Sequence, residues 1–104
     1  MSELSYQNAL ESEQKVAQLI ASIDESVVQI RQYQTEYSQD IVDMDARIIA
    51  RGMPDIEKRM RTVKFLQQLL QMEFDQLRQR EDLKSRLWQA KCMTATALQK
   101  LKVS

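Results

Sequence analysis

Apolar residues in the first half of the chain recur at alternating spacings of three and four residues. This heptad repeat is typical of an α-helix that packs an apolar stripe against another helix, and it excludes a β-strand, whose side chains alternate. The pattern predicts a helix over about residues 5–51. Its two series of core positions are Tyr6, Glu13, Ile20, Val27, Gln34, Ile41 and Ile48, and Ala9, Val16, Ile23, Ile30, Tyr37 and Met44.

The second half of the chain carries a similar repeat with one interruption, and it predicts a second helix over about residues 54–101. The series slips by one residue at the point where Arg80 would otherwise be buried. Its core positions are Ile56, Met60, Val63, Leu66, Leu70, Phe74 and Leu77, followed after the slip by Leu83, Leu87, Ala90, Thr94, Ala97 and Leu101.

A turn is predicted at about residues 52–54, between the two helices. Gly52 suits the left-handed conformation that ends a helix, and Pro54 suits the first turn of the next one. The two helices should then fold back on each other, with paired residue numbers that add to about 107, so that Met44 faces Val63. We therefore expect an all-α fold in which residues 1–104 form a single domain, a long antiparallel, coiled-coil-like helical hairpin.

A break in the first helix is the alternative to this hairpin. Residues 35–40 include possible helix-capping side chains, and a break there would give three or four shorter helices in a compact bundle. The heptad repeat runs through this stretch without a slip, which favours a continuous helix.

Composition removes most kinds of chemistry. The chain has one Gly, one Pro, one Cys and no His, so it lacks the turns of an all-β or α/β fold and every imidazole-based catalytic or metal site. One glycine cannot form a phosphate-binding loop. We therefore expect no enzymatic activity, no cofactor and no metal. The single Cys92 cannot form an intramolecular disulfide, which favours a cytoplasmic location, and no apolar run is long enough to span a membrane.

Charge is divided between the halves of a chain whose net charge is zero. Residues 1–52 hold nine acids and four bases, and residues 53–104 hold six acids and eleven bases. An acidic helix beside a basic one favours the hairpin and its orientation. The basic half also supports an alternative, a dimeric nucleic-acid-binding module. Its possible phosphate contacts are Lys58, Arg59, Arg61, Lys64, Arg78, Arg80, Lys84 and Arg86.

Each helix has more apolar residues than one seam requires. A wide apolar face indicates burial against more than one helix, so the hairpin should assemble into a bundle with a second copy, as a homodimer, or with another helical protein. The predicted contact residues are Val28, Val42 and Ile49 on the first helix, and Phe65, Leu69, Met72, Trp88 and Met93 on the second.

The expected function is protein–protein interaction, as a coiled-coil chaperone, an adaptor or a subunit of a larger assembly. With fourteen glutamines and no histidine in a short helical chain, the sequence resembles in outline the small coiled-coil chaperones and stalk proteins of bacterial type III secretion systems. That resemblance is one of shape and composition, and it implies a protein that depends on a helical partner.

Overall fold

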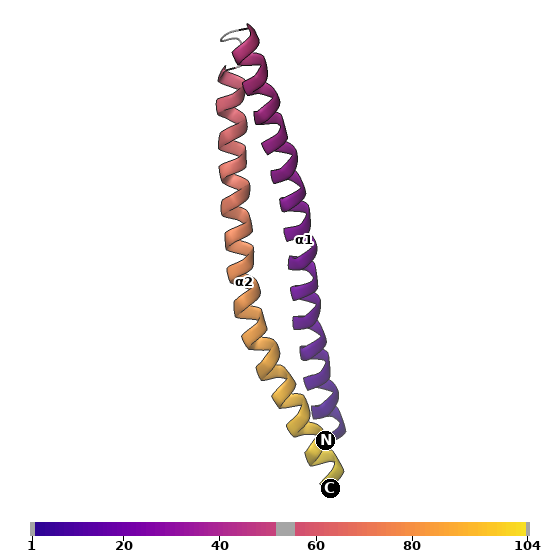
Figure 1. Cartoon of the computed structure of the whole chain (residues 1–104). Coiled ribbons are helices and arrows are strands. Elements are labelled where there is room, and N and C mark those ends of the chain that lie inside the picture. The colour runs from indigo at the N-terminus through magenta and orange to yellow at the C-terminus, as the bar shows by residue number, and fades with distance from the viewer. Residues whose placement is uncertain (1, 52–55, 104) are drawn as a thin grey trace. The chain divides into compact units, whose positions relative to one another are not determined.

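The structure is a computed structural model that describes residues 2–51 and 56–103, and all of these residues are helical. Helix α1 spans Ser2–Arg51 and helix α2 spans Ile56–Val103 (Figure 1). The all-α prediction is confirmed, and each described helix extends two or three residues beyond its predicted outer end. The predicted turn at about residues 52–54 lies outside the described residues.

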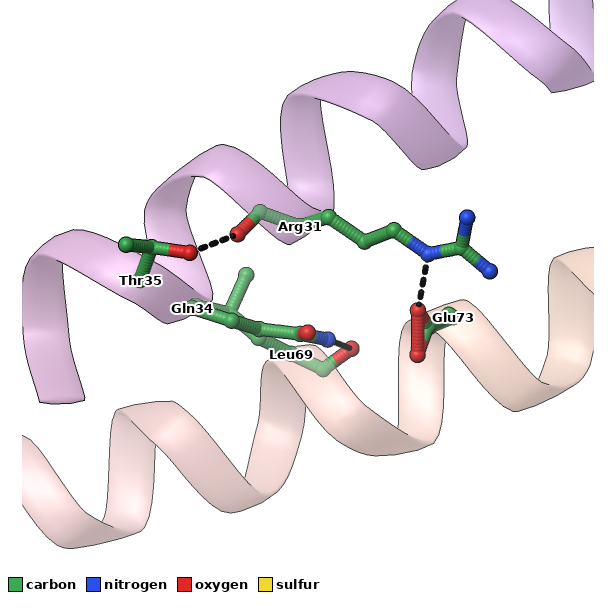
Figure 2. A network of polar contacts seen from close by, with 5 residues as sticks. All are labelled: Arg31, Gln34, Thr35, Leu69 and Glu73. Carbon is green, nitrogen blue, oxygen red and sulfur yellow. Dashed lines mark hydrogen bonds and ion pairs between the residues drawn. The ribbon is translucent and has the colours of Figure 1, made fainter.

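Helix α1 is continuous through residues 35–40, where a break was the alternative. The hydroxyl of Thr35 donates a hydrogen bond to the carbonyl oxygen of Arg31, one turn earlier, over 3.0 Å (Figure 2). A side chain that bonds back to its own helix does not start a new one. The heptad repeat therefore predicted this part of the chain correctly.

The two helices pair in two compact units. Unit 1 comprises residues 1–24 and 77–104, and unit 2 comprises residues 25–76. In each unit a segment of α1 and a segment of α2 run side by side in opposite directions (Figure 1). The hairpin predicted from the repeat is thus present as antiparallel helix pairing within each unit.

Unit 2 holds the most deeply buried side chains. Met44 is 1% exposed, and Val27 and Ile30 are each 5% exposed. Full burial of a side chain of this size contributes about 1.5–3 kcal/mol. Every other predicted core position of α1 in this unit is half-buried, so the seam of α1 is confirmed.

The predicted slip in α2 is wrong. Of the predicted positions, Ile56, Val63 and Leu66 are half-buried, but Met60, Leu70, Phe74 and Leu77 are exposed. The half-buried residues that replace them in the seam are Arg59, Thr62, Leu69, Glu73, Gln76 and Arg80. Together with Leu66, these positions continue the repeat of Leu83, Leu87 and Ala90 without interruption. An unbroken heptad keeps one face of the helix toward its partner. Three polar residues on that face, Arg59, Glu73 and Arg80, form ion pairs with α1.

The predicted pairing is also shifted by three residues. Asp24 with Arg80, Arg31 with Glu73, and Asp45 with Arg59 each add to 104, not to about 107. The prediction aligned the helices by matching apolar residues alone. The observed alignment is the one that brings opposite charges together.

Small residues form the core of unit 1. Ala90 and Thr94 are each 9% exposed, and the Thr94 hydroxyl donates to the Ala90 carbonyl oxygen over 2.9 Å. This internal bond satisfies the hydroxyl, so the buried threonine carries no unpaired polar group. The predicted seam positions Leu83, Leu87, Ala97 and Leu101 are half-buried, which confirms this part of the α2 pattern.

One seam residue has an unsatisfied atom. The side-chain oxygen Oε1 of Gln76 is buried and accepts no hydrogen bond from any residue that the structure describes. Leaving a buried acceptor unpaired costs about 1–3 kcal/mol.

We predict that Gln76→Leu stabilises the chain, because leucine fills a seam position without a polar atom. The free energy of unfolding should rise by about 1–3 kcal/mol, measured by urea denaturation followed by circular dichroism. Gln79→Leu, at an exposed position of the same helix, is the control and should change it by less than about 0.5 kcal/mol. An equal or lower stability for Gln76→Leu would contradict the prediction.

Candidate functional site

Ion pairs run along one side of the seam in unit 2. The Arg31 Nε donates to Glu73 Oε2 over 2.8 Å (Figure 2), and Arg59 donates to both carboxylate oxygens of Asp45. Arg31 and Asp45 each directly follow a buried seam residue, Ile30 and Met44, so they lie on the same side of α1. We call this side the ion-pair face of unit 2.

Unit 1 contains an ion pair of the same kind. The Nε of Arg80 donates to Asp24 Oδ1 over 2.6 Å. The hydrogen bond and the charge of Asp24 raise the pKa of the Arg80 guanidinium above its ordinary value. Because the pKa is raised in the folded state, the protonated Arg80 stabilises that state. The guanidinium stays protonated at neutral pH, so the pair with Asp24 is present throughout the neutral range.

Aromatic and sulfur-containing side chains lie on the opposite side of the seam in unit 2. The rings of Tyr37 and Phe65 stack, with centroids 6.4 Å apart and planes at 22°. Tyr33 lies one turn before Tyr37 on α1, and Leu69 and Met72 lie one and two turns after Phe65 on α2. We call these residues, Tyr33, Tyr37, Phe65, Leu69 and Met72, the aromatic face of unit 2.

A polar pocket of about 250 Å³ adjoins the aromatic face near the first turn of α2. Its walls carry two acids and two bases, which balance each other's charge. The lining residues are Asp40, Asp43, Met44, Arg47, Lys58 and Thr62.

The predicted contact residues of unit 2 divide between the two faces. Val28 and Val42 lie one turn before Arg31 and Asp45, and Ile49 lies one turn after Asp45, so all three belong to the ion-pair side. They are 65%, 60% and 87% exposed. Phe65 and Met72 belong to the aromatic face and are 53% and 48% exposed. The sequence prediction treated them as parts of one seam, but one flat partner surface cannot contact both faces.

Leu69 differs from the other predicted contact residues because it is half-buried between the helices. Its carbonyl oxygen accepts a hydrogen bond from Gln34 Nε2 over 3.4 Å (Figure 2). Gln34 is the polar residue that interrupts the α1 seam in unit 2, and this bond gives its side-chain nitrogen a partner on α2. Leu69 thus forms the floor of the aromatic face.

Trp88 and Met93 are the predicted contact residues of unit 1, and they are 69% and 66% exposed. They stand five positions apart along α2, which places them about 140° apart around the helix. They therefore lie on different flanks of unit 1 and do not form a single patch.

Sequence reasoning missed four exposed apolar residues because it assigned them to the seam. Met60, Leu70, Phe74 and Leu77 are 59%, 51%, 56% and 36% exposed. The signal that could have found them is the clean repeat of Leu83, Leu87 and Ala90. Extended toward the N-terminus without a slip, it reaches Arg80, Gln76 and Glu73.

The basic residues offered for phosphate binding are not equivalent. Arg59 and Arg80 are half-buried and paired with acids of α1, and Lys84 contacts Glu81 over 3.5 Å. Lys58, Arg61, Lys64 and Arg86 are exposed, as is Arg78, which takes part in a further interaction. Two of the eight candidates thus stabilise the helix pair, which reduces the basic surface.

Other kinds of site have little support in the described part of the chain. Within residues 2–51 and 56–103, no three acidic or cysteine side chains gather closely enough to hold a metal ion. Neither α1 nor α2, as far as described, contains a stretch long and apolar enough to cross a membrane. Cys92 is exposed.

Comparison with known proteins gives no family. No protein-family model, no curated protein and no solved structure matches the chain. The two faces of unit 2 and the exposed residues of unit 1 are therefore the basis for a functional proposal.

We predict that the Asp45–Arg59 ion pair sets the alignment of unit 2. Asp45→Arg should lower the free energy of unfolding because it places two cations together, and the double exchange Asp45→Arg with Arg59→Asp should restore most of it. A double-mutant cycle should give a coupling energy of about 0.5–1 kcal/mol, since both side chains are partly exposed.

The matched control for this cycle is Glu36→Arg, a charge reversal at an exposed position of the same helix. Combined with Arg59→Asp, it should give no coupling, because no contact joins the two positions. A coupling energy of zero for Asp45 with Arg59 would show that the alignment does not depend on the pair.

Proposed function

We propose that the chain is a non-enzymatic protein-interaction module, a small coiled-coil chaperone, adaptor or subunit that presents helical surfaces to a partner. The observation that carries the proposal is the balance of apolar side chains in the described residues. Four hydrophobic residues are buried, whereas fifteen large ones are exposed. Two paired helices bury only their inner stripes, so a chain of this kind gains stability when a further helix covers an outer face.

The exposed side chains are of the types that bind proteins. Phe65, Trp88, Met72 and Met93 are about half to two-thirds exposed. Aromatic residues act as large rigid anchors at interfaces, and methionine adapts to the shape of its partner. Charged flanks would add selectivity, because α1 is mostly acidic and α2 mostly basic.

The proposal places the module in the cytoplasm, where an exposed unpaired thiol such as that of Cys92 persists in its reduced form. Its partner is a helical protein, either a second copy or a different chain. Binding would follow the helix-in-groove mode, in which apolar anchors at helical spacing supply affinity.

Photo-cross-linking in the native cells tests this proposal. A photoreactive amino acid is placed singly at Phe65, Met72 or Trp88, and at the exposed polar position Gln71 of α2 as the matched control. We expect defined protein adducts, either of twice the mass of the chain or with another polypeptide, from the apolar positions and not from Gln71. If none of the three apolar positions gives a protein adduct, the proposal is overturned.

Nucleic-acid binding through the basic residues of α2 is the competing function, and salt dependence separates it from protein binding. A phosphate-binding module loses affinity steeply as salt rises, whereas a complex formed by apolar contacts does not. We expect no retention of the chain on a mixed-sequence DNA duplex or a single-stranded RNA at 150 mM salt, a concentration of roughly physiological strength. Salt-sensitive retention, lost in Lys58→Glu with Arg61→Glu, would favour the competing function.

A further inference from the structure

We propose that a second copy of the chain docks on the aromatic face of unit 2, and that the two copies form a four-helix bundle about a two-fold axis parallel to the helices. This inference rests on the proposed function and names its partner. It concerns unit 2 alone.

The aromatic face has the composition of an interface core. Tyr33, Phe65 and Met72 are each about half exposed, at 50%, 53% and 48%, and they surround the half-buried Tyr37 and Leu69. Stable interfaces place aromatic residues and methionine at the centre and polar residues at the rim. Because these side chains are half-exposed, a partner can bury the rest of their apolar area without breaking a contact that already exists.

The opposite face carries more exposed apolar residues, because Leu70 of α2 lies there with Val28, Val42 and Ile49 of α1. Its ion pairs nevertheless make it the poorer docking surface. The Arg31–Glu73 and Asp45–Arg59 pairs run along its centre, and the side chains of Arg31, Asp45 and Arg59 are 60%, 44% and 38% exposed. A partner that covered this face would remove those charges from water. That desolvation cost can exceed the attraction within the pairs, which favours the aromatic face.

Charge selects the orientation of the second copy. A two-fold axis across the helices would lay α1 on the partner's α1 and α2 on the partner's α2, which brings like charges together. Within unit 2, residues 25–51 of α1 hold five acids and three bases, and residues 56–76 of α2 hold three acids and four bases. A two-fold axis parallel to the helices lays the more acidic segment of each copy beside the more basic segment of the other. The bundle then consists of neighbouring helices that all run in opposite directions.

One pair of residues that would meet at the rim has opposite charges, Asp43 and Arg61. In unit 2, residues whose numbers add to 104 lie at the same level of the helix pair. Two-fold symmetry about the bundle axis preserves these levels, so Asp43 of one copy lies beside Arg61 of the other, and Glu36 beside Gln68. The numbers of Tyr33 and Met72 add to 105, so Tyr33 of one copy and Met72 of the other lie within one residue of the same level. They meet in the centre of the bundle. A chain whose own two flanks match in this way fits a second copy.

The first test is the oligomeric state of the full chain, measured by analytical ultracentrifugation across a wide concentration range. We expect a dimer that Phe65→Glu weakens at least about a hundredfold, because the substitution puts two carboxylates into the bundle core. Val42→Glu, on the ion-pair side and 60% exposed, is the matched control and should leave the dissociation constant unchanged. Circular dichroism of each variant confirms that the helices persist.

The second test exchanges charge at the rim. Asp43→Arg and Arg61→Asp should each weaken the dimer about tenfold, because each variant paired with itself brings like charges together twice. An equimolar mixture of the two variants should recover wild-type affinity as a mixed dimer, because both rim contacts then join opposite charges. Both substitutions are at exposed positions, so the folded helix pair should tolerate them.

A chain that stays monomeric at all concentrations would overturn the inference. So would a dimer that Val42→Glu dissociates and Phe65→Glu does not, or a mixture of the charge variants that fails to recover affinity. A monomer that is cross-linked through Phe65 to a different polypeptide would refute self-association and leave the proposed function standing. The proposed function fails on a separate result, the absence of any protein adduct.

Discussion

The unbroken heptad of α2 is the constraint on which the rest of the structure depends. A helix can keep one face toward an antiparallel partner over many turns only if its contact positions recur without a change of phase. Maintaining that phase turns Arg59, Glu73, Gln76 and Arg80 toward α1, and it leaves Met60, Leu70 and Phe74 outside. The polar seam and the apolar exterior are two consequences of the same geometry.

The ion pairs make this arrangement tolerable. Arg59 and Arg80 each contact an aspartate of α1, and Glu73 contacts Arg31, so the charged groups turned toward the seam retain partners. Partly exposed pairs contribute little stability individually. Their main effect is on alignment, because a shift of either helix by one turn would separate all of them. Gln76, whose side-chain oxygen has no partner among the described residues, shows what the same geometry costs where no charge is available.

The apolar surface left by this packing leads to the functional proposal. A pair of helices with polar residues between them has few apolar side chains left for its own core, and the others lie on its two outer faces. In unit 2, one of these faces contains ion pairs at its centre and the other contains a stacked aromatic pair, Tyr37 with Phe65. Because of this difference, we propose the aromatic face, and not the ion-pair face, as the docking surface.

The sequence by itself determined the helical fold, the seam of α1 and the seam of α2 beyond Leu83, because in those stretches apolar residues recur at heptad spacing with few exceptions. Seven of the eight residues predicted to make contacts are exposed, since residues outside a clean seam must lie on a flank. Only the tertiary structure decided the phase of α2 between Arg59 and Arg80, the alignment of the helices and the division of the candidates between two faces. In that stretch, hydrophobic patterning favours a seam made of apolar residues. The observed seam contains charged residues instead, and it is possible because partners distant in sequence, such as Asp24 for Arg80, pair with them. The spacing of apolar residues along one helix does not show which charged residues of the other helix lie opposite it.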